Sequence, residues 1–201
     1  MNLKGAFGEI DIYLFDQLLR GRISPGMRVL DAGCGTGRNI VFLLQNGCDV
    51  SAVDADPDAV SAVRQLAARL APALPPAQFR VEGVEALSFE EASFDAVISS
   101  AVLHFARDER HFDAMLRSMW RVLRAGGLLF ARLASTVGLE RSVHPLGGRR
   151  FRLPDGTDRF LVDEPMLAAS LEALGGRLLD PLKTTVVHGQ RSMTTWVVRK
   201  P

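Results

Sequence analysis

The chain has 201 residues, a formal net charge of +1 and 47% hydrophobic residues. This length and composition suit one globular domain and exclude a disordered, collagen-like or coiled-coil chain. The balanced charge argues against general attraction to nucleic acid, and no run of about 18 apolar residues indicates a membrane span. Two cysteines form no disulfide framework, and no Cys/His cluster has zinc spacing. The first residues lack the apolar core of a signal peptide. We therefore expect a cytoplasmic protein without metal, membrane or nucleic-acid partners.

The first predicted elements surround a glycine-rich turn. Apolar residues at helical spacing predict an amphipathic helix over Phe7–Arg20, and a short buried strand is expected over Arg28–Asp31. The turn Gly33–Gly37 follows this strand and opens a second helix, which ends near Gly47. The sequence thus predicts a strand, a glycine turn and a helix in immediate succession.

Strands and helices then alternate along the chain. A strand over Val50–Asp54 is followed by a helix with Asp56 as its N-cap and Pro57 at its first position, ending near Leu70. Such alternation predicts a mostly parallel sheet with helices on both faces. The next expected elements are strands over 78–82 and 94–99, a helix over 108–124 capped by Gly126–Gly127, and a strand over 128–133.

The last third of the chain is less regular. The turn signal Pro154-Asp155-Gly156 predicts a small hairpin within residues 134–162, and Asp163 is expected to cap a helix. Two final strands are expected over 177–187 and 193–199, the first made irregular by Pro181. Their short connection permits only an antiparallel pair.

The glycine turn is a candidate ligand site, because glycines let a ligand approach bare backbone at the carboxyl ends of parallel strands. Asp54 ends the next strand, where its carboxylate can accept both ribose hydroxyls of an adenosine. A dinucleotide site usually reads G-x-G-x-x-G, whereas this turn reads G-x-G-x-G. Asp31 would repel a pyrophosphate but can help to hold a cationic sulfonium and its α-amino group; the alternative is that it only braces the loop.

These residues resemble a known family. Val29–Gly37 resembles motif I of the class I S-adenosylmethionine-dependent methyltransferases, and Asp54 falls on that family's ribose-binding acid. Ser93–Ile98 is similar to its fourth strand, and Arg121–Leu129 to the segment that leads into its fifth. The resemblance implies a Rossmann-like, doubly wound, mostly parallel seven-stranded α/β sheet with an antiparallel C-terminal strand. A weaker likeness, through Gly37-Arg38-Asn39, is to the tellurite-resistance methyltransferases.

The resemblance also implies the cofactor, S-adenosylmethionine, and its contacts. One departure is that Gly83 stands where the family often has an acid that reaches adenine, so that Val84 would offer its backbone N–H. Glu85 is the nearest carboxylate and either replaces that acid or is a solvated loop charge. The predicted cofactor-binding residues are Asp31, Gly33, Cys34, Gly35, Gly37, Asn39, Asp54, Ala55, Val84, Glu85 and Ser99.

Methyl transfer from a sulfonium needs alignment and desolvation more than a dedicated base. His104 follows the fourth strand and is either a base or acceptor contact, or a histidine packed beside the cofactor. The arginine-rich segment 134–162 is either a basic lid that selects an anionic acceptor, or a solvated hairpin or dimer contact. The candidate acceptor-site residues are His104, Arg149, Arg152 and Tyr13, with ordinary packing as the alternative for Tyr13.

The sequence therefore predicts one domain over 1–201, with an N-terminal helix in 1–25, a cofactor-binding core over 26–133, a lid or hairpin over 134–162, and a C-terminal helix and strand pair over 163–201. The predicted activity is in-line methyl transfer to a small molecule. The alternatives are a non-catalytic S-adenosylmethionine-binding protein and an NAD-dependent oxidoreductase. The hairpin and final strands can mediate a homodimer.

Overall fold

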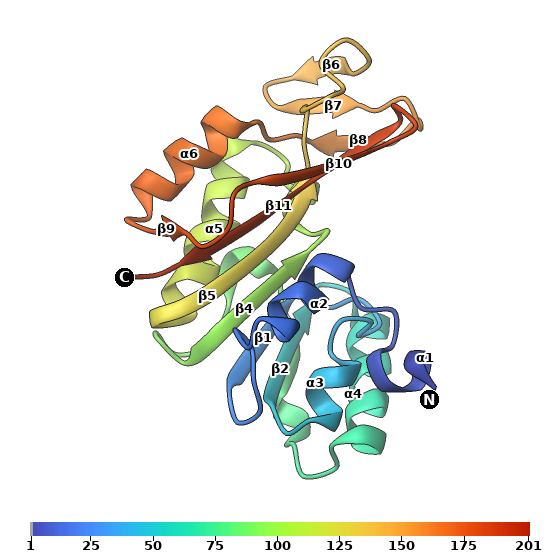
Figure 1. Ribbon diagram of the computed structural model, residues 1–201, viewed down its shortest axis with the longest axis vertical. Helices are drawn as coiled ribbons and strands as arrows, with labels where there is room; N and C mark the ends of the chain where they lie inside the picture. The colour runs from blue at the N-terminus through green and yellow to red at the C-terminus, as the bar shows by residue number, and fades with distance from the viewer. Residues whose placement is uncertain (1) are drawn as a thin grey trace.

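A computed structural model describes residues 2–201, whose strands form a mixed eight-stranded sheet. Seven strands follow the order β10-β11-β5-β4-β1-β2-β3, and the short β9 pairs with β11 (Figure 1). Strands β1 to β5 are parallel, whereas β11 is antiparallel to both of its long neighbours, β5 and β10. The predicted fold class is confirmed. The strands are β1 (Arg28–Ala32), β2 (Asp49–Asp54), β3 (Phe79–Val81), β4 (Phe94–Ser100), β5 (Leu123–Ala134), β9 (Arg177–Leu178), β10 (Lys183–Val187) and β11 (Arg191–Arg199).

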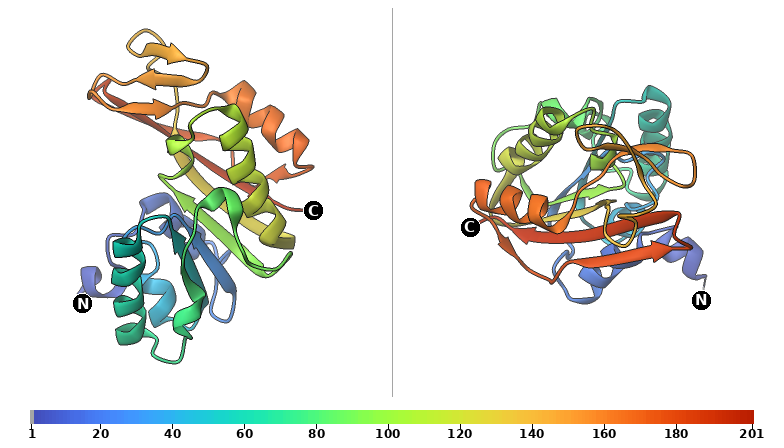
Figure 2. Two further views of the ribbon diagram at one scale, coloured as in Figure 1. Left: turned by 180° about the vertical axis from the view of Figure 1, so that it is seen from behind. Right: turned by 90° about the horizontal axis from the view of Figure 1, so that it is seen from above.

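Helices cover both faces of this sheet. Figure 2 shows α5 and α6 on one face and α2 on the opposite face. The pattern of buried residues explains the packing of α5, which buries Phe112, Met115, Leu116 and Met119 against the sheet. Within residues 2–201, no helix is both long and apolar enough to span a membrane. The helices are α1 (Leu3–Phe7), α2 (Ile12–Leu19), α3 (Val41–Gln45), α4 (Pro57–Leu70), α5 (Glu109–Val122) and α6 (Glu164–Ala173), with single 3-10 turns η1 (Pro76–Gln78), η2 (Val84–Ala86) and η3 (Leu103–Phe105).

Three predicted elements have other boundaries, one of them the strand expected over 177–187, which is divided around Pro181 into β9 and β10. The expected first helix is divided into α1 and α2, because Gly8 takes a left-handed φ of +64° and Asp11 begins α2 as a new N-cap. The pair Gly126–Gly127 does not cap a helix but lies within β5. There the Gly126 N–H donates to the carbonyl of Lys200, and the Lys200 N–H donates to the carbonyl of Gly127. These glycines are therefore paired with the end of the chain.

A second, three-stranded sheet follows β5 and stands above the end of the main sheet in Figure 1. The predicted hairpin is present: β7 (Arg150–Arg152) pairs with β8 (Asp158–Phe160) around the turn at Asp155. The third strand, β6 (His144–Gly147), was not predicted, because it contains Pro145 and has no apolar alternation. Phe160 fastens this sheet to the main core by stacking on Phe112 of α5, with ring centroids 5.1 Å apart.

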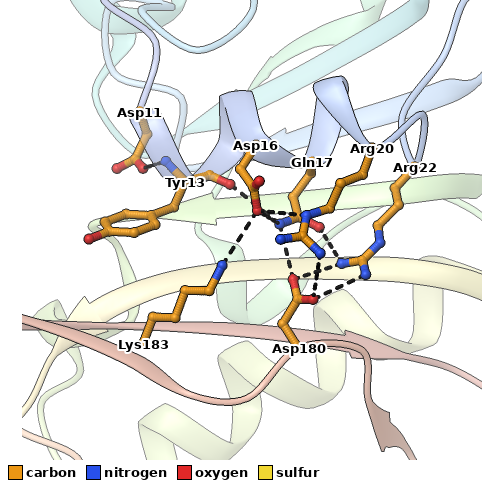
Figure 3. A network of polar contacts seen from close by, with 8 residues as sticks. All are labelled: Asp11, Tyr13, Asp16, Gln17, Arg20, Arg22, Asp180 and Lys183. Atoms are coloured by element: carbon orange, nitrogen blue, oxygen red, sulfur yellow. Dashed lines mark hydrogen bonds and ion pairs between the residues drawn. The ribbon is translucent and has the colours of Figure 1, made fainter.

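A polar network joins the beginning of the chain to its end (Figure 3). Asp180, between β9 and β10, accepts hydrogen bonds from Arg22 Nη1 at 2.7 Å, Arg22 Nη2 at 3.1 Å and Gln17 Nε2 at 3.2 Å. Asp16 of α2 accepts from Arg20 Nε at 2.9 Å and from Lys183 Nζ at 3.5 Å. These contacts hold α2 against the β9–β10 segment.

Candidate active site

A cavity of about 660 Å³ opens at the carboxyl edge of the parallel strands. The turns after β1, β2, β3 and β4 all contribute to it, as expected for a ligand site in an open α/β sheet. Ligand sites of small molecules typically have volumes of about 300–1,000 Å³. Its lining residues are Gly33, Cys34, Gly35, Thr36, Arg38, Asn39, Asp54, Ala55, Gly83, Val84, Glu85, Ser100, Ala101, Val102, Phe105, Arg107, His111 and Met115.

The glycine turn is crowded at Gly33 and open at Gly35. Gly33 has φ +83°, and a Cβ there would lie 2.4 Å from Cγ2 of Val102. Gly35 has φ +51° with no atom within 4 Å of such a Cβ, so the turn presents bare backbone at this point. The N–H groups of Gly33 and Cys34 both donate to the carbonyl of Val53, at 2.8 and 2.9 Å. The turn is thereby fixed to the end of β2.

Asp54 lies at the end of β2 and faces the same cavity. Its Oδ2 accepts from the Gly35 N–H at 2.8 Å, and its Oδ1 accepts from the Asp56 N–H at 3.0 Å. Two backbone donors therefore fix the carboxylate in orientation. Each oxygen keeps a further lone pair that can accept a hydroxyl of a bound ligand.

Asp31 lies behind the turn, 1% exposed, and does not line the cavity. Among residues 2–201, neither of its carboxylate oxygens has a hydrogen-bond partner. Burial raises the pKa of Asp31 to about 7; the nearby Arg38 opposes this shift, and Asp54 adds to it. An orphaned buried carboxylate beside a glycine turn fits a ligand that brings positive charge or N–H donors.

The predicted cofactor residues come together with three exceptions. Gly33, Cys34, Gly35, Asn39, Asp54, Ala55, Val84 and Glu85 all line the cavity. Asp31, Gly37 and Ser99 do not; Gly37 packs on Leu66 of α4 instead, and the next residue along β4, Ser100, takes the position expected of Ser99. Glu85 extends toward His111, with 3.5 Å between Oε1 and Nε2.

Sequence reasoning missed several lining residues. Arg38 directly follows the glycine turn, and this position could have indicated that it lines the cavity. Its Nη2 donates to Ser100 Oγ at 3.1 Å. Arg107, His111 and Met115 come from α5 and the loop before it, and no local pattern marks them. The thiol of Cys34 is an unsuitable nucleophile, because burial raises its pKa well above the usual range.

A second cavity, of about 410 Å³, adjoins the first. Ala101 lines both cavities and has φ +66°, a left-handed conformation that is uncommon without glycine and often marks a functional site. The other lining residues come from the η3 turn, β5, the β7–β8 hairpin and the ends of β10 and β11: His104, Arg132, Ala134, Leu153, Asp155, Thr157, Arg159, Val187, Arg191, Ser192 and Met193.

His104 faces this second cavity, not the first. It is 7% exposed, and its Nδ1 has no hydrogen-bond partner within the described part of the chain. Burial, with a smaller contribution from the charge of Arg159, lowers the pKa of His104 to about 4. The imidazole is therefore neutral near pH 7.

The other three candidate acceptor residues line neither cavity. Arg149 donates to Asp163 at 2.9 Å and Arg152 to Asp158 at 2.8 Å, so each guanidinium turns to its own carboxylate. The Tyr13 hydroxyl is 2.6 Å from Oγ1 of Thr185 on β10. Their charged and polar groups are therefore already bonded to other residues of the protein. No group of three metal-ligating side chains occurs among residues 2–201.

Comparison with known proteins gives concordant results. A methyltransferase domain family matches residues 29–127. A ubiquinone biosynthesis O-methyltransferase from Methylocella silvestris is 33% identical over 182 residues, which cover 83% of this chain and 68% of that protein. Among solved structures, a SAM-dependent methyltransferase from Methanosarcina mazei has a TM-score of 0.73 at 21% identity, covering 91% of this chain and 96% of that one. TehB from Haemophilus influenzae has a TM-score of 0.68 at 22% identity, covering 96% of this chain and 63% of that one.

Proposed function

Because the chain belongs to the class I S-adenosylmethionine-dependent methyltransferases, we propose that it methylates a small molecule that enters the smaller cavity while the cofactor occupies the larger one. The observation that carries this proposal is the pair of adjoining cavities with Ala101 in the wall of both. A methyl group need travel only a bond length, so donor and acceptor sites must meet at one point. Ala101 marks that point.

The residues of the larger cavity suit the cofactor at both of its ends. Asp54 would accept the ribose hydroxyls, and the Val84 N–H with Glu85 would meet the adenine. Asp31 precedes the turn and Arg38 follows it; the negative charge of Asp31 would favour the α-ammonium of the methionine moiety from behind the cavity wall, and Arg38 would favour its carboxylate. The orphaned oxygens of Asp31 support a positively charged ligand nearby.

Catalysis would rest mainly on alignment and desolvation. When bound, S-adenosylmethionine supplies a methyl group that is already activated on a sulfonium, so little acid–base chemistry remains for the protein. The fixed backbone of the glycine turn would set the position of the donor. His104 lines the smaller cavity together with Ala101 and would take up an acceptor proton.

Calorimetric titration of the wild-type chain and the Asp54→Ala variant tests this function. We expect micromolar binding of S-adenosylmethionine and S-adenosylhomocysteine and none of NAD. Loss of charged hydrogen bonds to the ribose should weaken both ligands about 10- to 100-fold in Asp54→Ala. Asp56→Ala is the matched control, because the Asp56 carboxylate caps α4 outside the cavity. This variant should bind both ligands with the affinity of the wild type.

Three outcomes would contradict the proposal. Binding of NAD in place of S-adenosylmethionine would favour an oxidoreductase. Equal affinity of the wild type and Asp54→Ala would remove the ribose contact. Binding of neither cofactor by the wild type would mean that the larger cavity serves another ligand.

A further inference from the structure

The smaller cavity holds one guanidinium without a carboxylate partner. Arg132 is paired with the buried Asp11 at 2.8 Å, and Arg191 with Asp155 at 2.6 Å. Arg159 donates only to the backbone carbonyl of Asp158, at 2.8 Å, and no carboxylate of residues 2–201 lies within ion-pair distance of it. The cavity therefore holds a guanidinium that has no direct ion pair within the part of the chain that the structure describes, and the nearby Asp158 is already paired with Arg152.

Arg159 stands at the rim of this cavity. Its guanidinium carbon lies 4.9 Å from the ring centroid of Phe105, a side chain that is 58% exposed. The ring supports the guanidinium from one side and leaves its planar N–H edge available. A guanidinium with a free edge matches the planar geometry of a carboxylate, which it binds through two parallel hydrogen bonds.

His104 supplies the second polar feature of the cavity. Its imidazole is buried and neutral, the side chain lines the cavity, and its Nδ1 has no hydrogen-bond partner among residues 2–201. A buried imidazole without a partner is costly unless a ligand or water completes it. The remaining wall combines apolar residues such as Leu153 and Met193 with the ion-paired Arg132 and Arg191.

We propose that the methyl acceptor is a compact carboxylate-bearing molecule, whose carboxylate binds Arg159 and whose nucleophilic O–H, N–H or S–H group bonds to the imidazole of His104. This inference rests on the proposed function and names the substrate class of the same site. The volume of about 410 Å³ suits a molecule of this kind with a small apolar body.

The two contacts would support each other. A carboxylate on Arg159 neutralises the charge that, together with burial, lowers the pKa of His104, so the imidazole becomes a better base when the acceptor is bound. The acceptor heteroatom would gain the bond to the methyl carbon, the sulfur would retain the electron pair of the broken bond, and the acceptor proton would pass to the imidazole of His104. Charge and atoms balance without another reactant.

Titrations of the protein saturated with S-adenosylhomocysteine test the Arg159 contact. The probes are benzoate and its neutral counterpart benzamide. We expect the wild type to bind benzoate at least tenfold more tightly than benzamide, and Arg159→Gln to lose that preference. Arg152→Gln is the matched control, since Arg152 lies on the same hairpin but is already paired with Asp158, and its preference should match the wild type.

The three monohydroxybenzoates test the His104 contact in the same titration. At least one isomer should bind severalfold more tightly than benzoate to the wild type, and this gain should vanish in His104→Phe while the affinity for benzoate itself stays the same. His104→Asn, which keeps a hydrogen-bonding group, should retain part of the gain.

The affinity for S-adenosylhomocysteine separates the possible failures. Wild-type protein that does not bind it contradicts the proposed function. Variants that bind it like the wild type are folded, so an unchanged benzoate preference in Arg159→Gln would overturn the substrate class. If no hydroxybenzoate gains affinity over benzoate, or if the gain survives in His104→Phe, the assignment of His104 is wrong.

Discussion

The two cavities are built in different ways. The larger one contains a turn fixed through its backbone: Gly33 and Cys34 donate to the carbonyl of Val53, and the Gly35 N–H donates to Asp54. The smaller one is enclosed in part by side chains joined through ion pairs, such as Arg132 with Asp11 and Arg191 with Asp155. A turn with a crowded glycine is sensitive to an added atom, whereas ion-paired side chains can be altered one charge at a time. Under the proposed function, the turn would hold the donor in a fixed position, and the smaller cavity would be the part in which specificity can vary.

The largest effect is expected at the glycine turn. Gly33→Ala would place a Cβ 2.4 Å from Cγ2 of Val102 at φ +83°, so the turn must move. We expect the free energy of unfolding to fall by about 1–3 kcal/mol and the affinity for S-adenosylhomocysteine to fall at least tenfold. Urea unfolding and calorimetry measure the two quantities.

Gly47→Ala is the control for this substitution. Gly47 has a similar φ of +75°, but nothing lies within 4 Å of the added Cβ. The Gly47→Ala substitution should lower the free energy of unfolding by about 1 kcal/mol, because of the left-handed backbone alone, and should leave cofactor affinity unchanged. If both variants lost the same stability and both bound the cofactor normally, the crowding at Gly33 would not matter.

A smaller effect is expected from the side-chain network that joins α2 to the end of the chain. The Asp180 side chain is 7% exposed, and its removal in Asp180→Ala would take one acceptor from the half-buried Arg22 and one from the buried Gln17. We expect a loss of about 1–2 kcal/mol in unfolding free energy and a cofactor affinity within twofold of the wild type. Asp113→Ala, which breaks an exposed pair with Arg117, should leave the unfolding midpoint unchanged.

The same network predicts a pH dependence. Burial alone would raise the pKa of Asp180, but hydrogen bonds from Arg22 and Gln17 outweigh it and lower the pKa below its usual value. The stability that Asp180 contributes is therefore complete above the unfolded-state pKa of about 3.9 and is lost as pH falls through the lower folded-state value. The difference between wild type and Asp180→Ala should shrink below about pH 4, and a constant difference would contradict the ion pair.

The difference between the two cavities also explains which residues the sequence could predict. The glycine turn and Asp54 are marked by local pattern, since a strand, a turn and the end of the next strand are close in sequence. The structure places most of the predicted cofactor residues around one cavity for this reason. The inclusion of Gly126 in β5 depends on its pairing with Lys200 far along the chain, whereas the division of the first helix comes from Gly8 and the Asp11 N-cap, which apolar periodicity does not register.

The residues of the smaller cavity could not be predicted from local pattern in the same way. The pairing of Arg132 with Asp11 spans 121 positions, and no local signal indicates which arginine keeps a free charge. Among the arginines of the hairpin segment, the sequence favoured Arg149 and Arg152, whereas both are paired and Arg159 lines the cavity. The composition shows that the chain has many arginines, but it does not show which of them lacks an ion-pair partner in the fold.

A crystal structure of the chain with S-adenosylhomocysteine tests the central claim most directly. The account predicts the adenosine in the larger cavity with its ribose on Asp54, and the sulfur directed at Ala101, facing the smaller cavity. Density for the homocysteine moiety that ends away from Ala101, or for the ligand in the smaller cavity, would contradict the account.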